Sequence, residues 1–290
     1  KHYFFLVRRL FLNQRDKWYG FTEDKVFGWV MDNKDFCKYV IQAVLPDLKI
    51  AEVMSIDTQK EINRPKDVSK DVRLDVLVKD TDGRLYDIEM QVANNGNLGE
   101  RMRYYQSRLD SFALEAGHSY NDLKETYIIF LCDFDYFHKK RMRYSFHLYE
   151  DKNKSIKLFN NATNVIINAK GSAKGQRLDL IGLVNLMNGK FDESNPHLAY
   201  AKQEIEEINK DPQRRKTIME YETKLLEVQQ EGERKGVKIG EKNILVRVAK
   251  RMMQKGNTKE EILEELSALN PAVALDEDRQ IVDEVFASKV

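Results

Sequence analysis

The sequence predicts an α/β fold, a mixed sheet flanked by helices and followed by an α-helical C-terminal region. Three observations support this prediction: a strand hairpin over residues 72–92, an amphipathic helix over 98–116 and a buried strand over 126–132. A hairpin joins antiparallel strands, whereas a strand, a helix and a strand in succession form a crossover between parallel strands. Because both connections share one strand, we expect the sheet to be mixed.

The hairpin is the most informative stretch of the chain. Apolar residues occupy the even-numbered positions of residues 72–78 and again of residues 86–92, which is the two-residue period of a strand. Between them, the sequence Asp80-Thr81-Asp82-Gly83 is typical of a tight turn, because glycine can adopt the left-handed conformation that ends a three-residue loop.

The length of this loop decides which residues oppose each other. A three-residue loop over 81–83 sets Asp75 opposite Glu89 and Arg73 opposite Gln91, with the polar side chains on one face. A two-residue loop would mix polar and apolar side chains on each face. We therefore expect the three-residue loop, which brings together two acidic residues from neighbouring strands.

Elements on either side of this core follow from the same periods. Residues 22–44 have helical spacing with a break near Asn33, and Pro46 ends them. The helix that follows the hairpin ends at Gly117. Further strands are expected over residues 144–149, 155–159 and 165–167, and a further helix over 178–187.

The C-terminal region differs in composition. After Asn195-Pro196 the chain is rich in Glu, Lys and Gln and is predicted to be helical. Glycines are expected to interrupt this helix at Gly232, Gly236 and Gly240. Shorter helices are expected over 243–254, 258–269 and 277–286. We divide the chain into an N-terminal extension over residues 1–20, a catalytic-size domain over 21–190 and a helical region over 191–290.

Composition narrows the class of protein. Acidic and basic residues nearly cancel at a net charge of +1, so any attraction to nucleic acid must come from local patches. Cys37 and Cys132 lie in apolar runs without a Cys or His at metal-ligand spacing, which indicates buried thiols in a reducing compartment. No apolar run is long enough to span a membrane. We expect a soluble, cytoplasmic protein with no membrane partner.

The opposed acids Asp75 and Glu89 are candidate metal ligands. Two carboxylates this close repel each other unless a cation lies between them. Mg²⁺ or Mn²⁺ prefers oxygen ligands, and Mg²⁺ keeps several waters, so two carboxylates and a main-chain carbonyl suffice. Gln91 points to the same face as Glu89, and its amide can orient a water. Acids that alternate with apolar residues are also typical of a solvated sheet face, so this pattern alone leaves both interpretations open.

A family resemblance favours the metal site. The segments that carry it are Arg73-Leu74-Asp75-Val76-Leu77-Val78, Asp87-Ile88-Glu89-Met90-Gln91, Arg101 with Tyr105 on the next helix, Gly117-His118-Ser119-Tyr120, and the strand over residues 128–134. Together they resemble the transposase branch of the PD-(D/E)XK nucleases, which is similar to the recombination-promoting nucleases. The resemblance extends over residues 21–190 and implies a restriction-endonuclease-like sheet. The chain departs from the motif at Leu74, where the motif has Pro, and at Gln91, where it has Lys.

The resemblance implies roles for individual residues. Asp75 and Glu89 would bind the metal, and Gln91 would occupy the position of the usual Lys. Asp24 on the first helix, with Glu23 as the less favoured alternative, would assist catalysis. The candidate contacts to DNA phosphates are Arg73, Arg101, Tyr105 and Arg108. The last three recur at helical spacing, so they can lie near one edge. A solvated arginine face with Tyr105 in the core is the alternative for this helix.

The leading hypothesis is a Mg²⁺- or Mn²⁺-dependent DNA endonuclease that hydrolyses phosphodiester bonds. The alternative is a catalytically inactive nucleic-acid-binding or assembly protein on the nuclease scaffold, because Gln91 carries no charge. An RNA nuclease would use the same residues, but we find no RNA-binding signature. The helical region over 191–290 could pair two chains into a homodimer, which would suit cleavage of both strands.

Overall fold

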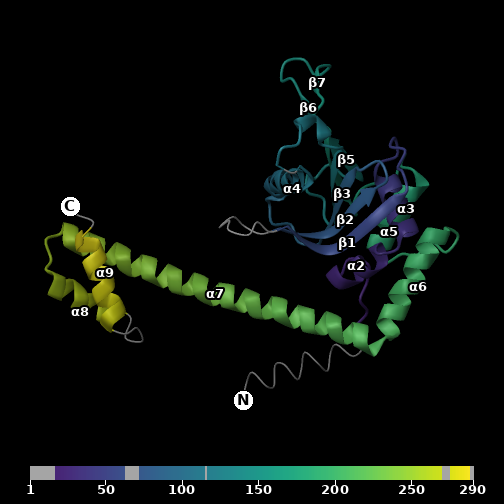
Figure 1. Cartoon of the computed structure of the whole chain (residues 1–290). Coiled ribbons are helices and arrows are strands. Elements are labelled where there is room, and N and C mark those ends of the chain that lie inside the picture. The colour runs from purple at the N-terminus through teal and green to yellow at the C-terminus, as the bar shows by residue number, and fades with distance from the viewer. Residues whose placement is uncertain (1–16, 63–71, 115, 270–274, 288–290) are drawn as a thin grey trace. The chain divides into compact units, whose positions relative to one another are not determined.

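A computed structural model describes residues 17–62, 72–114, 116–269 and 275–287 (Figure 1). The chain divides into two compact units, with the division between Arg215 and Lys216. The predicted boundary at residue 190 falls earlier in the chain. Residues 1–16 of the predicted N-terminal extension lie outside the described residues.

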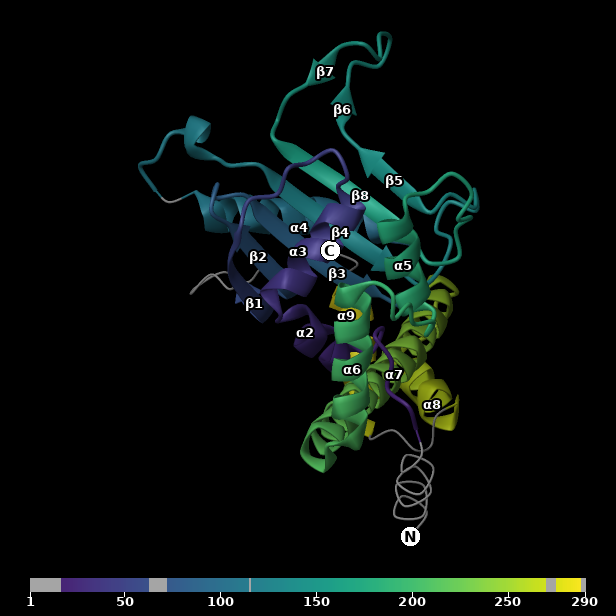
Figure 2. The same cartoon turned by 90° about the vertical axis from the view of Figure 1, so that its right-hand side faces the viewer.

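Six strands of the first unit form one mixed sheet in the order β1-β2-β3-β4-β8-β5 (Figure 2). The strands are β1 (Val53–Ile62), β2 (Val72–Asp80), β3 (Leu85–Gln91), β4 (Thr126–Cys132), β5 (Arg143–Phe146) and β8 (Ala162–Asn168). The pairs β3–β4 and β4–β8 are parallel, whereas β1–β2, β2–β3 and β5–β8 are antiparallel. The predicted mixed sheet is therefore confirmed. A separate two-stranded sheet joins β6 (Leu148–Tyr149) to β7 (Lys157–Leu158).

Helices cover both faces of the six-stranded sheet. Helix α4 (Leu98–Ala113) lies on one side and contacts β4 and β1 (Figure 1). On the other side lie α3 (Lys34–Val44), α5 (Leu178–Met187) and α6 (Pro196–Lys210), which contact one another. Helix α2 (Asp24–Met31) packs against α3, α6, β1 and β2. The contact with β2 places α2 beside the strand that carries Asp75.

Most predicted elements are present. The helical pattern over 22–44 is two helices, α2 and α3, and the side chain of Asn33 caps the second by accepting a hydrogen bond from the Phe36 N–H at 2.9 Å. Every residue of β4 is buried, as a strand covered on both faces requires. The predicted strand over 144–149 is divided between β5 and β6. Cys37 and Cys132 are buried free thiols.

Two features differ from the predictions. We predicted no strand over 53–62, yet β1 forms the edge of the sheet, where most of its side chains are partly or fully exposed and the apolar alternation is lost. We also expected glycines to interrupt the C-terminal helix, but α7 (Pro212–Gln254) continues through Gly232, Gly236 and Gly240. Each glycine costs only about 1 kcal/mol relative to alanine. Neighbouring ion pairs such as Glu231–Lys235, at 2.8 Å, support the helix there.

The hairpin has the predicted register. Gly83 ends the loop with φ of 81°, and the backbone pairs run from Lys79 opposite Leu85 to Val76 opposite Ile88. Continued by one residue, this register sets Asp75 opposite Glu89, as a three-residue loop requires.

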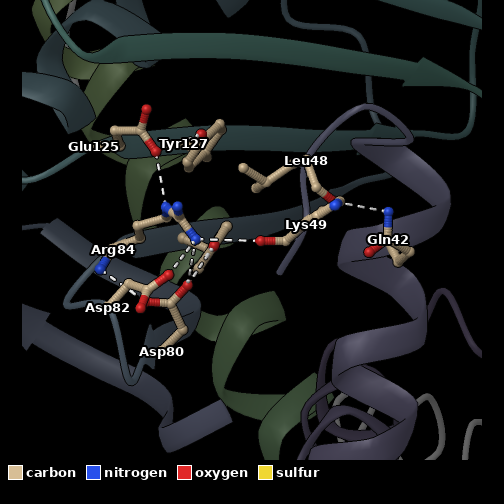
Figure 3. Close-up of polar contacts among 9 residues, drawn as sticks. Gln42, Leu48, Lys49, Asp80, Asp82, Arg84, Glu125 and Tyr127 are labelled. Carbon is tan, nitrogen blue, oxygen red and sulfur yellow. Dashed lines mark hydrogen bonds and ion pairs between the residues drawn. The ribbon is translucent and has the colours of Figure 1, made fainter. Parts of the chain in front are cut away.

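A polar network holds the turn end of the hairpin in place (Figure 3). Asp80 is fully buried, and its carboxylate accepts hydrogen bonds from the Arg84 N–H at 2.9 Å and from the Tyr86 hydroxyl at 2.8 Å. The Arg84 guanidinium donates to Glu125 Oε2 at 2.8 Å, which connects the turn to the segment before β4. The network therefore determines which residues of β2 and β3 face each other farther along the strands.

The second unit is helical. It consists of α7 from Lys216 onward, α8 (Lys259–Leu269) and α9 (Leu275–Ala287). Its core contains Leu245, Ala249, Ile262, Leu266, Ile281, Val282 and Val285. The two short predicted C-terminal helices are confirmed, whereas the predicted segment over 243–254 is the end of α7. None of the helices in the described ranges combines the length and apolar composition needed to cross a membrane.

We predict that Asp80→Ala lowers the free energy of unfolding of the first unit by about 3 kcal/mol, because it leaves the buried Tyr86 hydroxyl and the partly buried donors of Arg84 without their acceptor. The matched control is Asp82→Ala, which removes a half-exposed partner of the same arginine and should cost less than about 1 kcal/mol. Urea unfolding followed by tryptophan fluorescence measures both, since Trp18 and Trp29 lie in the first unit. Equal losses for the two variants would contradict the assigned role of Asp80.

Candidate active site

The two predicted acidic residues meet where β2 and β3 part. The backbone pairs extend as far as Val76 and Ile88, and beyond them side chains join the strands. The Asp75 N–H donates to Glu89 Oε1 at 2.8 Å, and the Met90 N–H donates to Asp75 Oδ2 at 3.0 Å. Each carboxylate thus accepts a hydrogen bond from the backbone of the opposite strand, which orients both side chains toward the gap between the strands.

Burial strongly perturbs these carboxyl groups. Burial, and to a lesser extent the charge of Asp24, raises the pKa of Asp75 to about 6, against the lowering effect of the Met90 N–H. The pKa of Glu89, whose residue is 2% exposed, is raised well above its ordinary value by burial and then by the charges of Asp87 and Asp75. Burial therefore opposes ionisation of both carboxyl groups, and a divalent cation beside them would favour their charged forms.

Asp87 is a third carboxyl group that the sequence analysis did not single out. It is fully buried, and burial raises its pKa well above the ordinary value. The available signal was its position two residues before Glu89 in the same strand, which gives both side chains the same face of β3.

Asp24 joins the cluster from the first turn of α2. Its Oδ1 accepts a hydrogen bond from Gln59 Nε2 at 2.9 Å, and its Oδ2 lies 3.5 Å from Arg73 Nη2. Its charge also contributes to the raised pKa of Asp75, after burial. The structure therefore brings Asp24, Arg73 and Asp75 together. It adds Gln59, which the sequence analysis missed because β1 was not recognised as a strand.

Arg101 approaches the same carboxylates from α4. Its guanidinium lies 3.4 Å from Glu89 Oε2, donates to the Tyr105 hydroxyl at 3.0 Å and donates to Gln91 Oε1. The other end of the Gln91 amide donates to the Ala93 carbonyl at 2.6 Å. Gln91 therefore holds the arginine. A positive charge stands beside Glu89 although the position of the usual lysine is occupied by an uncharged residue.

Arg108 lies outside this group. It is 6% exposed, and its Nη2 donates to the carbonyl of Ile62 at the end of β1 at 3.1 Å. Arg108 is seven residues from Arg101, which is about 10 Å along the helix axis. Two helical turns put Arg101 and Arg108 on the same face of α4. The separation along the axis nevertheless places Arg108 beyond the carboxylates, where it is buried. The structure supports a packing role for Arg108 and gives no basis for a phosphate contact there.

The acidic cluster fits a cation that keeps much of its water. Among the described residues, no group of three His, Cys, Asp or Glu side chains is arranged to enclose a metal ion. Asp75 Oδ2 and Glu89 Oε1 each accept a backbone hydrogen bond, and Glu89 Oε2 lies 3.4 Å from Arg101 Nη2, so a cation held by Oδ1 and Oε2 would share Oε2 with that arginine. Mg²⁺ is usually held by one or two carboxylates, with waters and substrate phosphates completing its shell. These two oxygens therefore fit a Mg²⁺-type site and not a structural zinc site.

The raised pKa of Asp75 predicts a pH-dependent penalty in the metal-free protein. The ordinary pKa is about 3.9, and the folded value of about 6 lies above it, so the folded state binds more protons between these values. Stability therefore falls as pH rises from 4 to 6, and the loss is complete above pH 6. We expect Asp75→Asn to raise the melting temperature at pH 8, with chelator present, and to leave it unchanged at pH 4.

Thermal melts followed by tryptophan fluorescence test this expectation, with Asp57→Asn as the control for a half-exposed acid on β1. An Asp75→Asn protein that melts below wild type at pH 8 would show that the negative charge stabilises the metal-free fold.

Comparison with known proteins gives one match. A family model described as PD-(D/E)XK nuclease family transposase matches residues 19–232, which include α2, the strands β1 to β3 and helix α4. Comparisons with curated proteins and with solved structures returned no match. The family match covers more than half of the chain and every element that contributes to the acidic cluster. The chain therefore belongs to the PD-(D/E)XK nuclease family transposases.

Proposed function

We propose that this protein is a metal-dependent endonuclease that hydrolyses phosphodiester bonds in DNA, with Mg²⁺ or Mn²⁺ as its cofactor. The observation that carries the proposal is the pair of carboxylates, Asp75 and Glu89, which are held side by side by each other's strands and are costly to bury without a cation. A nuclease-family chain has a direct use for such a pair.

The carboxylates and the cation would divide the chemistry between them. A bound Mg²⁺ supplies a Lewis acid for the phosphate and lowers the pKa of a coordinated water. Asp75 and Glu89 would hold the cation with their carboxylates. Asp24, held by Gln59 and Arg73, would add negative charge beside Asp75.

Arg101 takes the part that a lysine has in the general motif. The developing negative charge on a phosphate is stabilised by a fixed positive charge nearby, and such groups contribute most when they are already oriented. Gln91 and Tyr105 orient the guanidinium, and its ion pair with Glu89 at 3.4 Å keeps it at the cluster. In this proposal Gln91 acts by positioning Arg101 and does not contact the attacking water.

The second candidate function is a nucleic-acid-binding or assembly protein that keeps the scaffold without turnover. The observation that favours it is Gln91, whose amide is engaged at both ends by Arg101 and Ala93. Calorimetric titration with Mn²⁺ separates the two, because the inactive scaffold needs no metal. Pairing of two chains through residues 191–290 also remains a prediction, testable by light scattering.

We expect the purified protein to nick supercoiled plasmid in Mg²⁺ or Mn²⁺ and to be inactive with chelator. Asp75→Asn and Glu89→Gln should each lower the rate at least about a hundredfold, because each removes a ligand charge. The matched control is Asp151→Asn, which changes a fully exposed acid in a turn and should cut like wild type. Equal nicking by Asp75→Asn and wild type would assign the cleavage to a contaminant.

A second experiment tests the source of the positive charge. Arg101→Ala should lower the cleavage rate by about two to three orders of magnitude, as expected for loss of one transition-state donor. Gln91→Lys alone should also impair cleavage, because the new ammonium would face the guanidinium. The double variant Gln91→Lys/Arg101→Ala should recover part of the activity, since it returns one cation to the site. A double variant no faster than Arg101→Ala would refute the proposal that Arg101 supplies the positive charge of the usual lysine.

A further inference from the structure

Gln59 has an unusual backbone conformation for a residue within a strand. Its φ is 60°, in the left-handed region that residues other than glycine and asparagine rarely adopt. Its neighbours pair regularly with β2, Thr58 with Val76 and Lys60 with Leu74. The strained residue therefore stands beside Asp75, at the point of the sheet where the acidic cluster lies.

The two polar atoms of the Gln59 amide differ in their hydrogen bonding. Its Nε2 donates to Asp24 Oδ1 at 2.9 Å, and since a carboxylate only accepts hydrogen bonds, the amide nitrogen must be the end that faces Asp24. The opposite end, Oε1, is buried and accepts no hydrogen bond from any described residue. A buried carbonyl oxygen without a donor is unfavourable and calls for an explanation.

Backbone shape does not explain the choice of residue at this position. A bend in an edge strand could be made with Gly or Asn, which tolerate a positive φ better than glutamine does. Asparagine also carries an amide, but on a side chain one methylene shorter. Glutamine is therefore explained by the reach of its amide and not by the conformation of its backbone.

We propose that Gln59 is a positioning residue of the metal site. Its Nε2 holds the Asp24 carboxylate beside Asp75, and its Oε1 accepts a hydrogen bond from a water in the shell of the bound cation. This inference rests on the proposed function, because it requires a hydrated cation at Asp75 and Glu89. It accounts for the missing donor: a water bound to a cation donates hydrogen bonds, and Mg²⁺ keeps several such waters.

The test is the Mn²⁺ affinity of the intact chain carrying Gln59→Gly, measured by calorimetric titration. Glycine suits the observed φ, so the metal-free variant should melt at or above the temperature of wild type. Loss of an outer partner of a metal site typically lowers affinity by about 10- to 100-fold, and we expect a loss in that range. Gln59→Asn should bind as weakly as Gln59→Gly, because its shorter side chain cannot span to Asp24.

Asn161→Gly is the matched control for backbone strain. Asn161 also has a positive φ, 57°, but lies in the turn before β8, and its replacement should leave Mn²⁺ affinity unchanged. Asp75→Asn is the control for the site itself and should abolish binding.

The outcomes separate the inference from the function on which it rests. If wild type binds Mn²⁺, Asp75→Asn does not, and Gln59→Gly binds as tightly as wild type, the role of Gln59 is overturned while the proposed function stands. If wild type does not bind Mn²⁺, or Asp75→Asn binds equally well, the proposed function is overturned and the inference with it. A metal-free Gln59→Gly protein that melts well below wild type would show a structural role and would also overturn the inference.

Discussion

The site depends on the point at which β2 and β3 separate. Here side-chain carboxylates, instead of backbone carbonyls, accept the hydrogen bonds between the two strands. Asp75 and Glu89 each accept a hydrogen bond from an N–H of the other strand, so their positions depend on the register of the hairpin. That register is determined at the turn, where the buried Asp80 binds Arg84 and Tyr86. A slip of one residue would turn every side chain of a strand to the opposite face. Turn chemistry at one end of the hairpin thus positions the acids at the other.

The charged side chains around this point come from four elements. Asp24 comes from α2, Asp75 from β2, Glu89 from β3 and Arg101 from α4. Buried carboxylates of like charge raise one another's pKa, and Arg101 offsets only part of this effect at Glu89. The remaining negative charge favours a divalent cation. A match to a nuclease family that spans all four elements agrees with this interpretation, because a metal ion held by carboxylates can activate water for phosphodiester hydrolysis.

Much of this arrangement could be predicted from sequence because it depends on local rules. The alternation in β2 and β3 and the glycine at position 83 predict the register, and the register predicts the contact between Asp75 and Glu89. The parts that escaped prediction depend on contacts between distant segments. Edge strand β1 lacks an apolar alternation, so the strand was not predicted and Gln59 could not be placed beside Asp75. Arg108 lies on the same face of α4 as Arg101 by its spacing. Only the packed structure shows that its guanidinium binds the carbonyl at the end of β1.

The most direct test of a cation shared by Asp75 and Glu89 is anomalous diffraction from crystals of the protein grown with Mn²⁺. We expect a peak between the two carboxylates, within direct coordination distance of an oxygen of each, which is about 2.1 Å for Mg²⁺ and slightly longer for Mn²⁺. An ordered wild-type crystal in which Mn²⁺ occupies another position, with the two carboxylates turned away from each other, would contradict it.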